Sequence, residues 1–469
     1  MLNKQLHTAA RRDGTHCDRV HLALQCIAQR RELNAFIELF PDDALATARR
    51  LDDGASSTRA LTAGMTIAIK DNIHIAGKAC GAASRMLDGY IAPYDAQVIE
   101  RLRVADAILL GRANMDEFGM GSSGESSCHG HTRHPWLSDR VPGGSSSGSA
   151  CAVAAGLADA ALGSDAGGSV RQPAAFCGIV GIKPTYGRVS RWGLISFAPS
   201  FEQIGVLSPT VRGNAALLGC IAGADERDAT TVPLPVPDYV QACDRGVTGL
   251  RIGMVAAAME GDDPAWTVHA VDVAAERLRS GGALCTAVHA PSLDAVLPAY
   301  MVIAGMEALS NLARYEGMRY GRRVDAGDFD ASVDRSRAEG FGEEVQRRLL
   351  QGAWLLAAGE EADHYGKAQR VREALRREWL TMFVNSDVLL LPVCPQGPFV
   401  LGERRSDARG MREADRFTAL ANLIGVPAMS VPLDALPDGS RRAVQLLAPP
   451  FGEEALYAAA AALEAVYDV

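Results

Sequence analysis

The chain has 469 residues, of which 48% are hydrophobic and 22% charged, and its formal net charge is −9. This composition is that of a globular protein able to bury a large core, and it excludes a disordered chain. No dense run of Lys and Arg is interleaved with aromatic residues. A protein that grips nucleic acid by itself needs a basic face that displaces counterions from phosphates, so the composition also argues against that class.

In chain order, residues 1–60 have a helical pattern, with apolar positions recurring through 20–27. This segment is either a docking surface for a small partner or a helix packed on its own core. The apolar runs 65–70 and 107–110 are typical of buried strands. Residues 150–155 predict a helix that begins just after a serine-rich loop.

Further along, residues 249–255, 265–280 and 285–288 form a β-α-β pattern, which favours a mostly parallel sheet with helices on its faces. Residues 358–384 predict a long charged helix and 387–392 a buried strand. A looser polar segment, 396–412, follows; it either closes over a ligand or is an inert connection. The chain has no glycine-rich phosphate loop, so nucleotide use by this chain is not supported.

The ten cysteines are scattered without a C-x-x-C pair, so we expect free, mostly buried thiols. Cys128, His129, His131 and His134 offer soft ligands, but their spacing matches no regular zinc motif. We expect a polar loop near the active-site entrance there, and no metal. The first residues lack a signal peptide's apolar core, and no segment looks long and apolar enough to span a bilayer, which predicts a cytoplasmic protein.

The most informative serine is Ser169, which follows Gly167 and Gly168. Glycines before a serine let successive backbone N–H groups point into one concavity, as an oxyanion hole requires. By itself, such a run is more often a flexible turn or an anion-binding loop. The serine hydroxyl is also a poor nucleophile until a base removes its proton.

No His-plus-acid pair accompanies Ser169 in a recognisable motif, so the expected base is Lys70 acting through Ser145. Ser145 lies in a second serine-rich run, 142–149. Lys70 follows the apolar stretch 67–69, and burial there would lower its pKa and favour the neutral amine that can accept a proton. An isolated lysine at the end of an apolar strand more often extends its amine to solvent, so the three motifs gain weight only together.

Taken together, the three motifs and their spacing resemble the amidase signature family, whose members use a Lys, cis-Ser, Ser triad. The resemblance implies that Ser169 is the nucleophile, Ser145 the bridging serine in a cis peptide, and Lys70 the base. The oxyanion hole would be formed by the backbone N–H groups of Ala166, Gly167, Gly168 and Ser169.

The resemblance also implies the architecture. We expect a single large α/β domain, with a mixed, mostly parallel twisted sheet covered by helices on both faces. Residues 1–60 would be an N-terminal helical segment of that domain. Residues 61–469 would form the amidase signature domain, with the signature core at about 61–231.

Within the family, the chain is most similar to the glutamine-hydrolysing A subunits of tRNA-dependent amidotransferases. This likeness is carried by residues 114–123, 181–190, 310–315 and 336–342. It implies a glutaminase that releases ammonia from glutamine to amidate Glu-tRNA(Gln), Asp-tRNA(Asn) or both. The expected partners are the B and C subunits of such an enzyme. This chain would need no cofactor, ATP and Mg would act on the partner, and tRNA would be held indirectly through the partner.

The positions that match the subfamily's glutamine-binding residues are Tyr315, Arg348 and Asp415. Arg can clamp a carboxylate through two hydrogen bonds, and Asp can accept hydrogen bonds from an ammonium. Arg348 lies on an amphipathic helix, where charges are normally just solvated, so only the resemblance assigns it a role.

Several departures from the family pattern leave room for other functions. Ser147 replaces a glycine beside the bridging serine and would be strained if that position needs a positive φ. Ala166 replaces a threonine, and residues 201–206 also differ. One alternative is a free-standing amidase that hydrolyses another small carboxamide, and a second is a catalytically silent scaffold protein within a complex.

Overall fold

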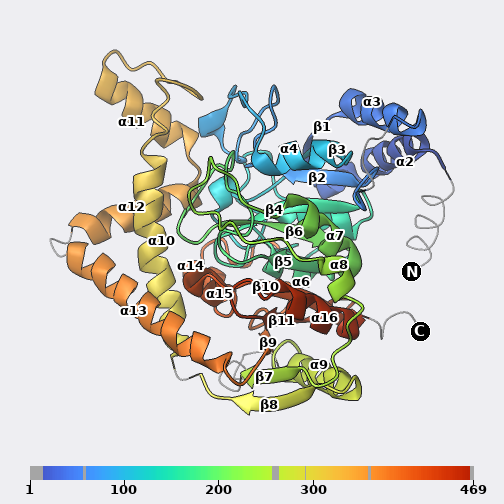
Figure 1. Cartoon of the computed structure of the whole chain (residues 1–469). Coiled ribbons are helices and arrows are strands. Elements are labelled where there is room, and N and C mark those ends of the chain that lie inside the picture. Colours follow the sequence, from blue (N-terminus) through green and yellow to red (C-terminus); the bar gives the residue numbers. More distant parts are fainter. Residues whose placement is uncertain (1–13, 56–59, 256–263, 291, 358–360, 465–469) are drawn as a thin grey trace.

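The computed structural model describes residues 14–55, 60–255, 264–290, 292–357 and 361–464 (Figure 1). Within these ranges an 11-stranded sheet runs through the molecule in the order β1-β3-β2-β4-β6-β5-β10-β11-β9-β7-β8. The strands are β1 Phe36–Leu39, β2 Thr66–Lys70, β3 Ile108–Ala113, β4 Ala160–Asp165, β5 Val180–Lys183, β6 Gln203–Ser208, β7 Arg251–Val255, β8 Leu284–Val288, β9 Val388–Pro392, β10 Ala428–Ala435 and β11 Arg441–Leu447.

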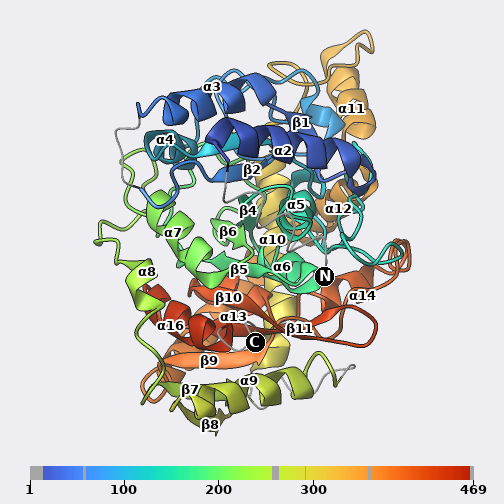
Figure 2. The same cartoon turned by 90° about the vertical axis from the view of Figure 1, so that its right-hand side faces the viewer.

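Helices lie on both faces of this sheet (Figures 1 and 2). They are α2 His16–Gln29, α3 Pro41–Asp52, α4 Gln97–Val104, α5 Ser147–Ala154, α6 Arg171–Cys177, α7 Val211–Ile221, α8 Tyr239–Ala242, α9 Val268–Ser280, α10 Val296–Leu312, α11 Phe329–Gly340, α12 Glu343–Ala357, α13 Glu361–Met382, α14 Ala408–Glu413, α15 Ala419–Ile424 and α16 Glu453–Glu464. The single α/β domain and its mixed sheet are confirmed.

The expectation of a mostly parallel sheet is wrong. β2 pairs in parallel with β3 and β4, and β7 pairs in parallel with β9 and β8. The strands between these two parallel units, together with β1 at the edge, pair antiparallel. The β-α-β units are visible as local sequence patterns. Some antiparallel pairings join consecutive strands, such as β10 with β11, but others join strands distant along the chain, such as β5 with β10, and no local pattern encodes those.

The parallel unit around β2 positions the chemistry. β2 is buried along its whole length, and its apolar residues end in Lys70. β4, its parallel neighbour, ends in Asp165. Because parallel strands present their carboxyl ends at the same edge of a sheet, Lys70 and the loop that leaves β4 toward Ser169 open on the same side.

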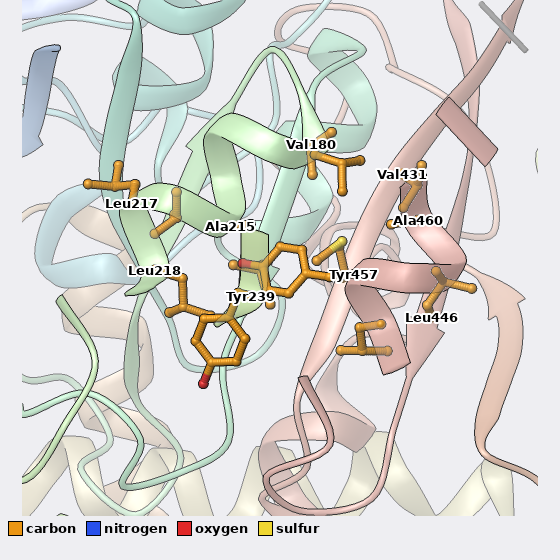
Figure 3. Packing of buried hydrophobic residues seen from close by; sticks show 14 of the residues in the cluster. Val180, Ala215, Leu217, Leu218, Tyr239, Val431, Leu446, Tyr457 and Ala460 are labelled. Atoms are coloured by element: carbon orange, nitrogen blue, oxygen red, sulfur yellow. The ribbon is translucent and has the colours of Figure 1, made fainter. Parts of the chain in front are cut away.

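Apolar clusters hold the helices to the sheet, and two of them are the largest among the described residues. One joins α7, α8 and α16 to the central strands, and Tyr239 and Tyr457 meet there with ring centroids 5.4 Å apart (Figure 3). The Tyr457 hydroxyl donates to Asn214 Oδ1 at 2.9 Å, so this deeply buried phenol has a partner. The other cluster packs α10 and its neighbours on the opposite face.

By length and composition, one segment of the described chain, Leu293–Leu312, could cross a membrane. This corrects the expectation that no segment is long and apolar enough. The segment contains α10, which contacts α12, α13 and α15 (Figure 1). The apolar character of α10 is explained by the helices that surround it. α10 is therefore a core helix of this fold.

The N-terminal segment is partly helical and partly a strand, since β1 lies between α2 and α3; residues 1–13 and 56–59 lie outside the described residues. The apolar positions of α2, among them Val20, Ala23 and Ile27, are buried in the chain's own core. The described part of this segment therefore packs on its own domain through its apolar face. That face is the one expected to bind a partner if the segment were a docking surface. Figure 2 shows α2 and α3 covering the β1 end of the sheet, far from β7 and β8.

Five of the ten cysteines are buried and five partly buried, and none forms a disulfide bond. In the loop that carries Cys128 and three histidines, His134 Nε2 pairs with the Phe176 carbonyl oxygen at 2.9 Å. His134 Nδ1 accepts hydrogen bonds from the N–H groups of Trp136 and Leu137. Among the described residues, no group of three or more His, Cys, Asp or Glu side chains is placed to hold a metal ion.

Candidate active site

Lys70 ends β2 with its side chain fully buried. Its Nζ donates to Ser145 Oγ at 2.7 Å and to Ser164 Oγ at 3.0 Å, and it lies 3.2 Å from the Ser164 carbonyl oxygen. The structure therefore brings Lys70 and Ser145 into direct hydrogen-bond contact, although they lie on a strand and a distant loop.

Burial lowers the pKa of Lys70 from 10.5 to about 7, against the opposing pull of the buried carboxylates of Glu202, Asp116 and Asp165. A lysine with this pKa is neutral in an appreciable fraction of molecules near pH 7. It can therefore accept a proton, which an ordinary lysine cannot do at that pH.

Ser145 follows a cis peptide bond from Gly144, as the resemblance implies. Gly144 has no room for a side chain: a Cβ there would overlap the Asp116 carboxylate and lie 2.9 Å from the Ser123 nitrogen. Asp116 in turn accepts hydrogen bonds from the N–H groups of Gly124 and Ser126. The loop that carries Ser145 is thus packed against a buried acid that is itself tied to a neighbouring loop.

Ser169 lies between β4 and α6 and is partly exposed, unlike the buried residues around it. Its carbonyl oxygen accepts from the Ser146 N–H at 3.1 Å, so the loop of Ser169 is joined to the residue after Ser145. The three residues predicted to form the triad therefore lie on adjoining segments. The accessible one is the residue that would have to reach a substrate.

Asp165 holds the turn that carries Ser169. Its carboxylate accepts from the N–H groups of Gly168 and Val170, at 2.8 and 3.1 Å, and forms a buried ion pair with Arg171 at 2.8 Å. Burial opposes ionisation, but the Arg171 guanidinium holds the pKa of Asp165 well below its usual range. Asp165 is therefore a permanent anion that fixes the backbone on both sides of Ser169.

This contact corrects the predicted oxyanion hole. The Gly168 N–H points to Asp165 and has no second hydrogen to offer a substrate. The candidate donors that remain are the N–H groups of Ala166, Gly167 and Ser169. The sequence motif shows that Gly168 can adopt its φ of +139°, but only the fold shows which way its N–H faces.

Arg348 and Asp415, predicted to bind the substrate, come from α12 and from the segment after α14, and both are nearly buried. Arg348 Nε donates to Glu344 Oε1 at 2.7 Å, and its guanidinium stacks over Phe197. Asp415 accepts from Ser122 Oγ at 2.9 and 3.0 Å, and burial raises its pKa to about 7. The fold thus brings the Arg348 guanidinium and the Asp415 carboxyl group close enough for each to shift the pKa of the other.

The tyrosine beside this pair is Tyr300, not Tyr315. A Cβ on Gly167 would lie 2.5 Å from Tyr300 Oη, so the hydroxyl touches the loop of Ser169. Arg348 and Asp415 are both charged neighbours of that hydroxyl, whose pKa is raised by burial.

Tyr315 instead lies beyond the C-terminal end of α10, with its ring 5.0 Å from that of Phe118 and 6.1 Å from that of Tyr320. Tyr300 lies in the second turn of α10, so the two tyrosines are separated by most of the length of that helix, roughly 20 Å at 1.5 Å per residue. The structure therefore brings Tyr300, and not the predicted Tyr315, together with Arg348 and Asp415. Sequence reasoning overlooks Tyr300 because it lies in an apolar helical run, where a tyrosine is ordinarily a core residue.

The contrast between the two tyrosines gives a direct test. Tyr300→Phe is expected to raise KM for the substrate about tenfold with a smaller effect on kcat, because it removes one buried hydroxyl beside Arg348 and Asp415. Tyr315→Phe is expected to change both constants less than threefold. Steady-state kinetics of the two variants checks this, and equal effects would contradict the assignment.

The departures in the serine loop are accommodated. Ser147 begins α5 and is not among the residues with positive φ, so the expected strain is absent there. Its hydroxyl pairs with Thr132 Oγ1 at 3.1 Å, and Gly124 leaves the space that its Cβ occupies. Ala166 is buried and keeps its backbone N–H. Neither change disturbs the hydrogen bond between Lys70 and Ser145.

The candidate site thus consists of a buried lysine with a pKa of about 7 in contact with one serine, an accessible serine on an adjoining loop, and a group of backbone N–H donors. The chain belongs to the amidase family, whose model, described as Amidase, matches residues 20–457. The architecture and the site thus agree with the family assignment.

Among its relatives, the A subunit of glutamyl-tRNA(Gln) amidotransferase from Synechococcus sp. (strain RCC307) is 48% identical over 442 residues, covering 93% of this chain and 91% of the relative. The crystal structure of the A subunit of glutamyl-tRNA(Gln) amidotransferase from Thermotoga maritima is 36% identical, with a TM-score of 0.78, and covers 94% of this chain and 89% of that chain. The native peptide amidase from Stenotrophomonas maltophilia is 28% identical, with a TM-score of 0.79, and covers 99% and 96% of the two chains.

Proposed function

We propose that this chain is the glutamine-hydrolysing A subunit of a tRNA-dependent amidotransferase. The observation that carries the proposal is the nearly buried pair of Arg348 and Asp415 beside the Ser169 loop. A free amino acid has one carboxylate and one ammonium, and these two side chains complement both charges. An uncharged carboxamide substrate has neither charge and would gain no such complementarity from this pair.

In the proposed reaction, Ser169 Oγ attacks the side-chain carbonyl carbon of glutamine. Ser145 passes the Ser169 proton to neutral Lys70 and accepts a proton from it in the return step, so that the proton reaches the departing nitrogen as ammonia leaves. The N–H groups of Ala166, Gly167 and Ser169 stabilise the tetrahedral oxyanion. Water then hydrolyses the acyl-enzyme by the same proton relay and releases glutamate.

The relatives named above support the wider assignment. The B and C subunits of the amidotransferase would be the partners, and the ammonia would be used to amidate Glu-tRNA(Gln), Asp-tRNA(Asn) or both. ATP and Mg would act on the B subunit, and tRNA would be bound there, in keeping with the net charge of −9 on this chain. A complex that serves protein synthesis would work in the cytoplasm.

The test is ammonia release from glutamine, from asparagine and from a simple carboxamide, by the chain alone and by the chain with the B and C subunits. We expect glutamine to be the best substrate, the partners to increase its turnover, and Ser169→Ala to abolish it. Faster turnover of the simple carboxamide by the chain alone would instead identify a free-standing amidase. Unchanged activity of the complex with Ser169→Ala would identify a catalytically silent scaffold.

A further inference from the structure

One buried amide joins the two halves of the site. Gln172 is fully buried in the first turn of α6, three residues after Ser169. Its Oε1 accepts from the Gly144 N–H at 2.9 Å, and its Nε2 donates to the Ser122 carbonyl oxygen at 2.8 Å. Its own backbone N–H donates to the Gly168 carbonyl oxygen at 2.8 Å. Gln172 therefore holds three separate loops together.

Each end of this bridge leads to a group with a role in the reaction. On one side, Ser122 Oγ donates to the Asp415 carboxylate at 2.9 and 3.0 Å. On the other side, Gly144 precedes Ser145, whose Oγ accepts from Lys70 Nζ at 2.7 Å. A continuous path of hydrogen bonds and short covalent segments thus runs from Asp415 to the bridging serine.

The bridge needs both a donor and an acceptor at the end of one side chain, because it meets a carbonyl oxygen at one end and an N–H at the other. A primary amide supplies both, whereas a carboxylate lacks the donor and a thioether lacks both. The space is also closely fitted, since a Cβ on Gly143 would lie 2.6 Å from Gln172 Oε1. The chemistry and the fit both favour glutamine at this position.

We propose that Gln172 is a positioning residue. Its hydrogen bonds link the Asp415 carboxylate, through Ser122, to the alignment of Ser145 with Lys70. Binding of an ammonium at Asp415 fixes Ser122, and Gln172 carries that constraint to the peptide of Ser145. The role assigned to Asp415 rests on the proposed function. The contact of Gln172 with the Ser145 loop is independent of the proposed function.

The experiment measures kcat and KM for glutamine in the complex with the B and C subunits, for Gln172→Met, Ser122→Ala and the double variant. Gln172→Met keeps the length of the side chain and loses both hydrogen bonds, and we expect kcat/KM to fall about 10²-fold, with losses in both constants. Ser122→Ala keeps its carbonyl but frees Asp415, so KM should rise about tenfold. Because the two residues act in one path, the double variant should lie within threefold of Gln172→Met.

A matched control separates positioning from stability. Gln203 is also fully buried, and it likewise accepts from a backbone N–H, that of Gly187, and donates to a backbone carbonyl, that of Val189. Gln203→Met should lower the thermal unfolding temperature about as much as Gln172→Met and leave KM within threefold of the wild type. Gln172→Glu retains the acceptor for Gly144 and loses the donor, so its main effect should be on KM, which provides a second readout if the Met variant does not fold.

The proposal is overturned if the losses of the two single variants multiply to about 10³-fold in the double variant. It is also overturned if Gln203→Met reproduces the kinetic loss of Gln172→Met. If the wild-type complex releases no ammonia from glutamine, the proposed function fails instead. Gln172→Met measured on the amide that is hydrolysed then decides the role of Gln172, through kcat alone.

Discussion

Lys70→Arg is expected to lower kcat/KM for amide hydrolysis by about 10⁴-fold, close to the floor set by Ser169→Ala. The change keeps a cation against Ser145, but a guanidinium stays protonated at any pH the enzyme survives, so it cannot take the serine proton. Lys70 can do so because burial lowers its pKa to about 7.

The pH dependence adds a second readout for Lys70. Only the neutral amine acts as the base, so wild-type kcat/KM should rise with pH and level off above about pH 7, whereas the residual activity of Lys70→Arg should show no step from this group. Lys183→Arg is the matched control: Lys183 is also buried, its pKa is also lowered by burial to about 7, and its Nζ donates to the Pro184 carbonyl oxygen. If kcat/KM of the Lys70→Arg variant lies within tenfold of that of the Lys183→Arg variant, the role of Lys70 as the base is refuted.

Asp415→Asn is expected to lower kcat/KM for glutamine about 10³-fold, because the ammonium of the substrate would lose its buried counter-charge. Turnover of glutaramate, which is glutamine without its α-amino group, should change less than threefold. Steady-state kinetics with the two substrates checks this. Parallel losses on both would show that Asp415 supports the fold of the site instead of recognising an ammonium.

The pH profile separates the two titrating groups. Burial raises the pKa of Asp415 to about 7, near that of Lys70, and both groups must be deprotonated in the free enzyme. Below about pH 6, log kcat/KM for glutamine should therefore fall with a slope approaching 2 per pH unit. Asp415→Asn should reduce the slope to 1, and an unchanged slope would contradict the assignment of Asp415.

The sequence itself was sufficient to single out the three candidate triad residues and to predict several elements. Lys70, Ser145 and Ser169 stand in short motifs whose chemistry is local: a lysine after an apolar strand, and serines among glycines. β2, α5 and the unit formed by β7, α9 and β8 were likewise visible, because their apolar periodicity is written in consecutive residues. These features depend on neighbours along the chain.

The tertiary structure decided what depends on residues distant along the chain. The antiparallel centre of the sheet is one such feature, and the choice of Tyr300 over Tyr315 is another, since either tyrosine suits a polar wall until the direction of α10 is known. The Gly168 N–H is withdrawn from the oxyanion hole because the Asp165 carboxylate faces it. Motifs and their spacing thus identified the candidate groups for the chemistry, whereas packing determined where they point, because hydrogen-bond direction and burial are set by contacts across the fold.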